Sequence, residues 1–453
     1  MLVIGAVVFV IAVGGWLIYA FSRPAWYTFF PVDLGIYRDG GLIVRHVSPP
    51  YNGQPLYDWH ATDNPDSLQF TYTPFAAVFF AGISFISWAV LPRLSELANL
   101  AFLLIATWFT MDALGYRDRR VKIGGMLAGA AAGLLIEPVF RTIFLGQINL
   151  LLLALIIWDL RQPDDRWWKG FGTGLAAGIK LIPIIFVPYL LLTRRFKAAV
   201  MTVAGFAFSI GLGFVVISHD SRRYWLDGLF YQDNRTGFAG WTGNQSLRGL
   251  VTRLAGSLHA ATIPWAVAVL VAAVIGLLAA AMLDRAGHPM LGILTAALVG
   301  LLDSPISWDH HWVWVVPGMM TAAHYAVRAW QRSGAVTWNV IGCAATGIAL
   351  LLIFASWPGK LWSTPMGGAG AFTYGLIWAG NYSKVSTYIA IGDKPWFKEY
   401  HWSGLQNLSG NAYILTGIAL LILLAVIALR SRREVRTAPA SPESSPASAA
   451  RPA

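Results

Sequence analysis

Uncharged runs long enough to cross a lipid bilayer recur along the whole chain, and they constrain its fold more than any other feature. Five such runs are Leu2 to Phe21, Ala198 to Ser218, Leu254 to Leu283, Ala335 to Gly359 and Ser403 to Leu429. A helix needs about 20 apolar residues to cross the hydrocarbon layer, and its backbone groups are paired within the helix itself. Membrane-spanning strands would instead show apolar and polar residues in alternation over segments of roughly ten residues. The runs therefore predict an all-α polytopic membrane protein.

The composition supports this class. Of 453 residues, 56% are hydrophobic and 12% are charged, with a mean hydropathy of +0.57, whereas soluble domains are roughly a quarter charged. A net charge of +11 suggests nucleic acid in a soluble protein. Here the basic residues cluster at predicted helix ends, where they set membrane orientation, so we expect no nucleic-acid partner. The single Cys343 forms no internal disulfide.

The basic clusters predict which helix ends face the cytoplasm. Ten full crossings fit between them: residues 2–21, 95–115, 123–137, 147–160, 198–217, 262–283, 289–303, 312–327, 339–357 and 412–429. Both termini are then cytoplasmic. Residues 1–430 form the membrane domain, with an uncleaved first span. The Ala/Pro/Ser-rich tail, residues 431–453, is predicted to be disordered in the cytoplasm.

Two segments do not fit a simple crossing. Residues 170–193 begin and end at basic clusters, and Pro183 interrupts them, which predicts two short helices that enter the membrane and return. Residues 72–91 resemble a partial helix near the outer interface. Three long outer loops remain, at residues 22–71, 218–261 and 358–411.

Polar residues that carry chemistry gather at the predicted outer ends of the spans. The four clusters are Asp33 with Tyr37, Arg38 and Asp39; Glu137 and Arg141 with Gln147 and Asn149; Asp303 to His311; and Asn244 with Gln245 and Arg248. Charged groups at membrane depth are costly and tend to be functional. Lys180 stands apart, at mid-depth in the re-entrant pair. We expect the four clusters to converge.

Six short motifs stand in an order that carries a family resemblance. They are Asp33-Leu34-x-x-Tyr37, Phe70 to Phe75, Gly146 to Leu150, Gly178-Ile179-Lys180-Leu181-x-Pro183, Gly243 to Ser246, and Ser307-Trp308-x-His310-His311. Together, over about residues 30 to 320, they resemble the actinobacterial polyprenyl-phosphate-mannose-dependent α-(1→2)-mannosyltransferases, glycosyltransferase family 87, of the GT-C fold.

The resemblance implies an enzyme of the plasma membrane whose active site faces the extracytoplasmic side. It would take mannose from a lipid-phosphate donor and pass it to a mannosylated lipid, such as a phosphatidylinositol mannoside, a lipomannan or a lipoarabinomannan. In this family the loop after the first span resembles the site of the catalytic carboxylate, which corresponds to Asp33. No cofactor is implied.

The proposed chemistry explains these residue types. A β-linked mannosyl phosphate that yields an α-linkage is inverted in one displacement, and one carboxylate then suffices as the base. We predict Asp33, His310 and His311 as catalytic. The departing phosphate needs cationic or hydrogen-bonding partners, for which the candidates are Arg141, Arg248, Lys180 and the two histidines. This chemistry requires no metal ion, although Asp309 beside two histidines leaves open the alternative of a metal site.

Further substrate-binding roles are predicted for Tyr37, Arg38, Glu137, Gln147, Asn149, Asn244 and Gln245. Each prediction has a structural alternative. Asp33 could cap the helix that follows it, with Asp39 and then Glu137 as competing bases. The histidines could anchor a helix start, and Lys180 could brace the broken helix. For Gln147 and Asn149 we favour helix capping, and for Asn244 and Gln245 contact with the substrate.

Three other functions remain open. A transporter or lipid flippase would also use a mid-depth lysine and a broken helix, but the polar clusters crowd one face and do not line a two-sided path. A non-catalytic assembly subunit would not need carboxylates, histidines and arginines together. Transfer of arabinose or another pentose from a lipid phosphate would need nearly the same fold and motifs, and only the family resemblance favours mannose.

Overall fold

The computed structural model describes residues 2–21, 31–61, 68–356, 375–381, 389–391, 394–396, 399, 402 and 404–437. Most of the predicted tail, residues 438–453, and parts of the predicted outer loops 22–71 and 358–411 lie outside these ranges. The described chain is helical apart from the antiparallel pair β1 (Ile389–Ile391) and β2 (Lys394–Trp396). This agrees with the predicted helical class.

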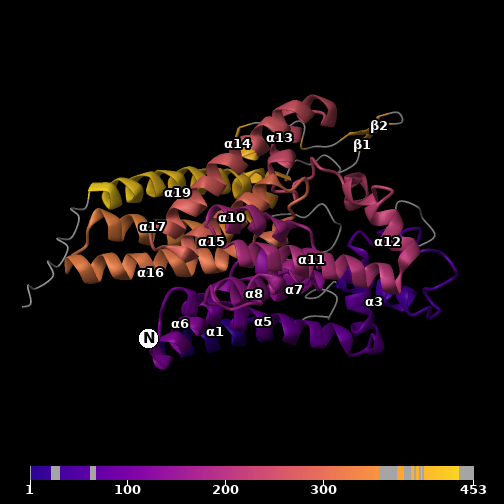
Figure 1. Cartoon of the computed structure of the whole chain (residues 1–453), viewed down its shortest axis with the longest axis horizontal. Helices are drawn as coiled ribbons and strands as arrows, with labels where there is room; N and C mark the ends of the chain where they lie inside the picture. The colour runs from indigo at the N-terminus through magenta and orange to yellow at the C-terminus, as the bar shows by residue number, and fades with distance from the viewer. Residues whose placement is uncertain are drawn as a thin grey trace, which may run out of the picture.

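The first half contains α1 (Leu2–Phe21), α3 (Val32–Val44), α4 (Pro74–Ala81), η1 (Ile83–Phe85), α5 (Leu91–Ala113), α6 (Arg119–Leu134), α7 (Glu137–Leu145), α8 (Asn149–Leu160), α9 (Phe171–Ile179), η2 (Ile182–Ile185), α10 (Phe186–Leu192), α11 (Phe196–Val216) and α12 (Ser218–Trp225). Helix α1 packs against α6, α6 against α5 and α5 against α8, and α9 packs against α11. Their axes run close to one direction, while α3 and α12 lie at one end of the bundle (Figure 1).

The second half contains η3 (Leu229–Tyr231), η4 (Asp233–Thr236), α13 (Leu247–Ala255), α14 (Leu258–Arg285), α15 (Pro289–Asp303), η5 (Asp309–Trp314), α16 (Val315–Ser333), α17 (Trp338–Phe354), η7 (Leu376–Asn381), α18 (Leu405–Gly410) and α19 (Ala412–Thr437). Helix α14 packs against α15 and α19, and α16 against α17. Figure 1 shows this group beside the first one.

Within the described ranges, four helices are long and apolar enough to cross a membrane: α5, α11, α14 and the part of α19 up to Ser431. Helices α7 and α8 pass the same test as a pair but are bent by 117°. Further apolar stretches of 10 to 17 residues occur in α1, in η2 together with α10, in α15 and in α17. The membrane-protein class is thus supported, while four or five of the ten predicted crossings meet this criterion.

The re-entrant segment is broken, but not where the sequence suggested. Helix α9 ends at Ile179, and Lys180 has an extended backbone with φ −140° and ψ 120°. Pro183 lies in the first turn of η2, where its missing N–H costs no helical hydrogen bond. The break therefore falls at Lys180, and the prediction of a break at Pro183 was wrong by three residues.

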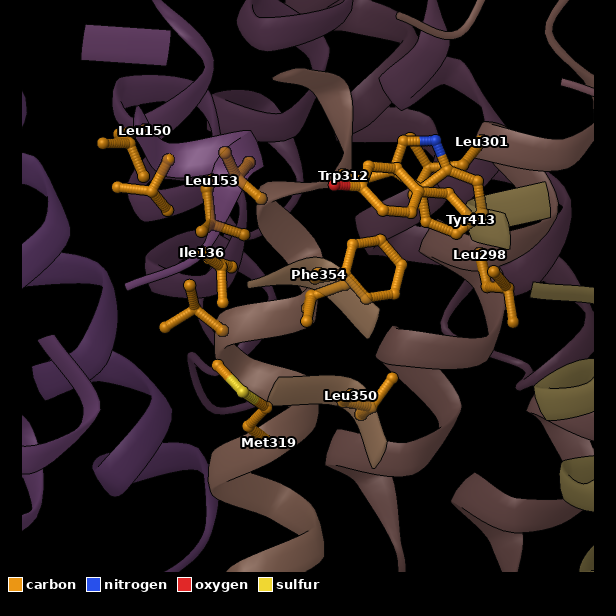
Figure 2. Close-up of a cluster of buried hydrophobic side chains, with 14 of the residues drawn as sticks. Ile136, Leu150, Leu153, Leu298, Leu301, Trp312, Met319, Leu350, Phe354 and Tyr413 are labelled. Carbon is orange, nitrogen blue, oxygen red and sulfur yellow. The ribbon is translucent and has the colours of Figure 1, made fainter. Parts of the chain in front are cut away.

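A buried apolar cluster joins the two halves and underlies the polar site. Figure 2 shows Ile136, Leu150 and Leu153 from the first half near Trp312, Met319, Phe354 and Tyr413 from the second. Because lipid is as apolar as these side chains, close packing rather than water exclusion holds such helices together. Ile136, Leu150 and Trp312 lie within two residues of Glu137, Asn149 and His310, so the cluster fixes the backbone that carries the polar residues.

Candidate active site

Asp33 lies in the first turn of α3 and is half-buried. Its Oδ2 accepts a hydrogen bond from Nε2 of Gln147 at 2.7 Å. The N-cap of α3 is Pro31, and no side chain caps this helix. The helix-capping alternative for Asp33 was therefore wrong, and the carboxylate instead faces a residue 114 positions further along the chain.

Gln147 joins Asp33 to two tyrosines. Its Oε1 accepts a hydrogen bond from the Tyr37 hydroxyl at 2.7 Å and lies 3.1 Å from the Tyr72 hydroxyl. The two hydroxyls are 2.6 Å apart. Because hydroxyls occupy the oxygen, the amide nitrogen is left to donate to Asp33. The prediction that Gln147 caps a helix was wrong, since its carboxamide orients the carboxylate.

Gly146 makes the approach of Gln147 to Asp33 possible. It ends α7 in the left-handed region, with φ 70° and ψ 34°, where residues with a Cβ are disfavoured. A Cβ on Gly146 would lie 2.5 Å from Cβ of Leu34. The bend between α7 and α8 and the close packing of α3 thus meet at one glycine, next to both Asp33 and Gln147.

Tyr72 and Lys180 complete one side of the cluster. Thr73 caps α4 by accepting from the Ala76 backbone N–H at 3.1 Å, and its hydroxyl donates to the Gly178 carbonyl. This holds Tyr72 beside the end of α9. The Lys180 ammonium lies 5.6 Å from the centre of the Tyr72 ring. Lys180 therefore belongs to the site. The sequence-based expectation that it stands apart from the other polar residues was wrong.

Asn149 connects Lys180 to the histidine segment. Its Oδ1 accepts from Nζ of Lys180 at 2.9 Å, while its Nδ2 donates to the His310 carbonyl at 2.9 Å and to the Thr142 hydroxyl at 3.2 Å. The N-cap of α8 is Ile148, with no side-chain cap. The favoured capping role of Asn149 was therefore wrong.

The histidine segment is held by an ion pair and by a neighbouring loop. Oδ2 of Asp309 accepts from Nε of Arg141 at 3.1 Å, and Oδ1 lies 2.9 Å from Nδ1 of His310. The loop from Gly243 to Gln245 pairs with this segment through two backbone hydrogen bonds of 2.8 Å, from Gln245 to Ser307 and from Asp309 to Gly243. The Nε donor of Arg141 is thus used in binding Asp309, and this contact gives no support for a role in binding phosphate.

Charge and burial act together on these groups. Burial lowers the pKa of His310, an effect that Asp309 opposes, and the charges of Lys180 and Asp33 also act on this ring. Burial, Lys180 and His310 hold the pKa of His311 well below its usual value. Burial alone would raise the pKa of Asp309, but Arg141 and His310 more than offset it, and that pKa is lowered. The site therefore contains neutral histidines beside a charged Asp309.

Glu137 is a structural residue. It is fully buried, and its carboxylate accepts from Trp378 Nε1 and the Tyr413 hydroxyl, both at 3.0 Å. Nε of Arg141 is 3.8 Å away. Its two oxygens thus tie α7 to η7 and α19, and the predicted substrate-binding role of Glu137 is not supported.

Asn244 and Gln245 are likewise fully buried. Asn244 donates to the Ala239 and Pro305 carbonyls at 2.8 and 3.1 Å and accepts from the Ser307 N–H at 2.9 Å. Gln245 donates to the Thr242 and Gly410 carbonyls at 2.6 and 2.8 Å. The structure gives no support for substrate contact by either residue, because their polar atoms brace the loop that supports Asp309.

Arg38 and Arg248, which the sequence predicted to bind substrate, make contacts outside the cluster around Asp33. Nε of Arg38 donates to the Ile86 carbonyl at 3.3 Å, and Asp39 lies 4.0 Å from its guanidinium. The Arg248 guanidinium stacks over the Trp265 ring at 4.9 Å. These contacts give no support for a place in the cluster around Asp33.

Sequence reasoning did not assign roles to Tyr72 or Asp309. Tyr72 was visible only as part of the Phe70 to Phe75 motif, and Asp309 only as a neighbour of the histidines. Among the residues that the structure describes, no group of three or more His, Cys, Asp or Glu side chains is arranged to hold a metal ion. The site combines two carboxylates, a lysine, two histidines and two tyrosines.

Comparison with known proteins identifies relatives over most of the chain. The model of "Glycosyltransferase family 87" matches residues 70–305. A Mycobacterium tuberculosis protein named polyprenol-phosphate-mannose-dependent alpha-(1-2)-phosphatidylinositol pentamannoside mannosyltransferase is 34% identical over 390 residues, which are 84% of this chain and 85% of the relative. A Mycolicibacterium smegmatis protein of the same name is 31% identical, over 82% of this chain and 88% of its own length.

A third relative, from Mycobacterium tuberculosis, is named polyprenol-phosphate-mannose-dependent alpha-(1-2)-phosphatidylinositol mannoside mannosyltransferase. It is 31% identical over 69% of this chain and 75% of its own length. The residues matched by the family model include Tyr72, Gln147 and Lys180, whereas Asp33 lies well before the matched range and His310 shortly after it. In the structure, the residues inside the matched range and those outside it lie in one cluster.

Proposed function

Because this chain belongs to glycosyltransferase family 87, we propose that it transfers mannose from polyprenyl phosphate mannose to a mannosylated lipid. The relatives are named for this donor and for phosphatidylinositol mannoside acceptors, which favours mannose over arabinose. The expected product carries a new α-(1→2) linkage. The proposed acceptor class also includes lipomannan and lipoarabinomannan precursors.

The single observation that carries the proposed mechanism is the setting of Asp33. It is a half-buried carboxylate held by Gln147, and the charges of Asp33 and Lys180 act on one another. A carboxylate that is both accessible and fixed can remove the proton of an attacking hydroxyl. In the displacement, the acceptor oxygen bonds to the anomeric carbon as the bond from that carbon to the phosphate oxygen breaks. Asp33 takes the proton, and polyprenyl phosphate leaves with the electron pair.

Lys180 is proposed to bind the departing phosphate. One of its N–H groups donates to Asn149, and an ammonium has three donors. The fixed contact to Asn149 orients the ammonium, which favours stabilisation of charge that develops in the transition state. His310 and His311 remain catalytic candidates as neutral groups. The proposal includes no metal ion.

We propose that the site opens to the extracytoplasmic face of the plasma membrane. Helix α8 begins beside Gln147 and ends before Arg161, and α16 follows His311 and carries Arg328 and Arg332 in its last two turns. The site and the basic residues thus lie at opposite ends of these helices. Basic residues favour the cytoplasmic side, which supports an outward site. The remaining crossings of the ten-span, GT-C-type topology are part of the same proposal.

The activity is tested by combining genetics with a direct assay. Deletion of the gene should cause one glycolipid that lacks a terminal mannose to accumulate. Membranes that contain the protein should then mannosylate that lipid from radiolabelled polyprenyl phosphate mannose, and an α-(1→2)-specific mannosidase should release the label. Label that is transferred only from polyprenyl phosphate arabinose would support the pentose alternative instead. An unchanged glycolipid profile together with no transfer would contradict the proposal.

A further inference from the structure

Asp309 has a position that the proposed reaction does not yet use. Its side chain is buried between the Arg141 guanidinium and the His310 imidazole. Oδ1 also accepts from the backbone N–H of His310 at 2.8 Å. Three contacts therefore fix this carboxylate against the residue that follows it.

The arrangement determines which nitrogen of His310 carries the proton. Arg141 neutralises the charge of the carboxylate on one side, and the lowered pKa of Asp309 keeps it ionised. An ionised carboxylate accepts hydrogen bonds only, so Nδ1 of His310, 2.9 Å away, must be the protonated nitrogen. Nε2 on the other side of the ring then carries a lone pair.

Nε2 of His310 is buried and has no hydrogen-bond partner among the described residues. A buried acceptor without a partner is costly, so such an atom in a native structure calls for a reason. The His310 ring is about 5% exposed and lies where the charges of Asp33 and Lys180 act on it. A substrate group bound in this cluster can supply the missing donor.

We propose that Asp309 is a positioning residue that fixes His310 in the tautomer whose Nε2 accepts a hydrogen bond from a sugar hydroxyl. This inference rests on the proposed function and names what His310 recognises. A phosphate oxygen offers no proton at neutral pH, so a neutral Nε2 selects the carbohydrate and not the leaving group. The earlier idea of His310 as a cationic partner of the phosphate is thereby replaced, and that role falls to Lys180.

Several titratable groups face this histidine. Asp309, Asp33, Lys180 and His311 act directly on its ring, while Arg141 and Glu137 act on Asp309 from behind. Among these, Asp309 and Asp33 raise the pKa of His310 and Lys180 lowers it. Replacing Asp309 by a neutral residue must therefore lower that pKa further.

The test is the pH dependence of kcat/KM for mannose transfer by purified, full-length Asp309→Asn protein. Nε of Arg141 can still donate to the amide oxygen, which turns the amide nitrogen toward Nδ1 of His310. His310 would then carry its proton on Nε2 and lose the acceptor. We expect kcat/KM to fall by about 10-fold to 100-fold, and the acid limb of the profile to move to lower pH.

Asp284→Asn is the matched control. Asp284 is another carboxylate that is buried against an arginine, with NH1 of Arg195 at 2.8 Å and the Tyr189 hydroxyl at 2.6 Å, but no histidine lies on it. Loss of a buried ion pair alone should lower the stability of both variants. Only Asp309→Asn should shift the acid limb.

His310→Gln provides the second arm and remains informative if Asp309→Asn does not fold. Protonation of His310 removes its acceptor and contributes to the acid limb, so the slope of log kcat/KM against pH on the acid side should become shallower in His310→Gln. Adding Asp309→Asn to His310→Gln should cause little further loss, since residues that act through one another are not additive.

Two results would overturn the inference. One is an acid limb that is unchanged in both single variants, and the other is losses that multiply in the double variant. Either would leave Asp309 as a structural residue. Neither result bears on Asp33, so failure of this inference can be distinguished from failure of the proposed reaction, which the Asp33→Asn variant tests.

Discussion

The side-chain amide of Gln147 donates to Oδ2 of Asp33 across 2.7 Å. This one hydrogen bond joins the first turn of α3 to the turn between α7 and α8, directly after Gly146. The Gln147 oxygen is occupied by the Tyr37 hydroxyl, so the amide cannot rotate without losing both bonds. The carboxylate is therefore held in a fixed position, which suits the base that we propose.

Gln147→Leu should keep the fold but release Asp33. A hydrogen bond to a charged group contributes about 1.5–3 kcal/mol, and each 1.4 kcal/mol corresponds to a factor of about ten in rate. We expect kcat/KM for mannose transfer to fall by about 10-fold to 100-fold. Gln162→Leu is the control, because Gln162 donates to the Trp158 carbonyl at the other end of α8. Equal activity of the two variants would show that Gln147 does not orient the base.

Lys180→Met should weaken the interaction with the leaving group. The variant loses the cation that we assign to the polyprenyl phosphate, so we expect kcat to fall by about 100-fold or more and product inhibition by polyprenyl phosphate to become weaker. Steady-state kinetics with added polyprenyl phosphate measure both. Exposed Lys197 at the start of α11 provides the control variant Lys197→Met. Unchanged inhibition in Lys180→Met would contradict a phosphate-binding role.

Gly146→Ala should disturb both the fold and the site. A residue with a Cβ costs about 1–2 kcal/mol in the left-handed region, and here the Cβ would also collide with Leu34. Gly334 ends α16 with a similar φ of 65°, but a Cβ there meets nothing within 4 Å. Gly334→Ala should therefore lower thermal stability alone, whereas Gly146→Ala should also lower the activity of the folded fraction. Equal specific activities would argue against the link between this bend and Asp33.

Asn244→Ala should act on stability and not on substrate affinity. It would leave the buried N–H of Ser307 and two carbonyls without this partner, at about 1–3 kcal/mol for each group left unsatisfied. We expect a lower melting temperature and an unchanged KM for the acceptor. Asn52→Ala on the exposed surface should change neither. A raised KM with normal stability would restore the earlier prediction of substrate contact.

Much of the site could be predicted from the sequence because its residues lie at helix ends. Asp33, Gln147 and His310 each stand where an apolar run begins or ends, and the positive-inside rule predicts that these ends share one face. The order of the motifs then indicated the family. These inferences needed only local patterns and chain direction.

The roles of several residues depended on partners that no local pattern indicates. Glu137 appeared to be a candidate for substrate contact because a carboxylate at a span end is unusual, yet Trp378 and Tyr413 from the far end of the chain enclose it. Asn244 was similar, with its partners on the Ser307 segment. Burial by distant segments decided these cases.

The break in the re-entrant segment illustrates a different limit. Proline is the strongest local signal for a helix end, but it is also tolerated in a first helical turn, which is where Pro183 lies. The extended residue is Lys180. Its contact with Asn149 on α8 is a tertiary interaction, so the sequence indicated that the helix breaks but not the residue at which it does.

The most direct test of the account is mannose transfer by Asp33→Asn protein in membranes, with radiolabelled polyprenyl phosphate mannose and the acceptor lipid. Asp39→Asn, six residues along the same helix, is the matched control. We predict that Asp33→Asn accumulates normally and transfers no label, while Asp39→Asn retains activity. Full transfer by Asp33→Asn, or its loss only in Asp39→Asn, would contradict the assignment of the catalytic base.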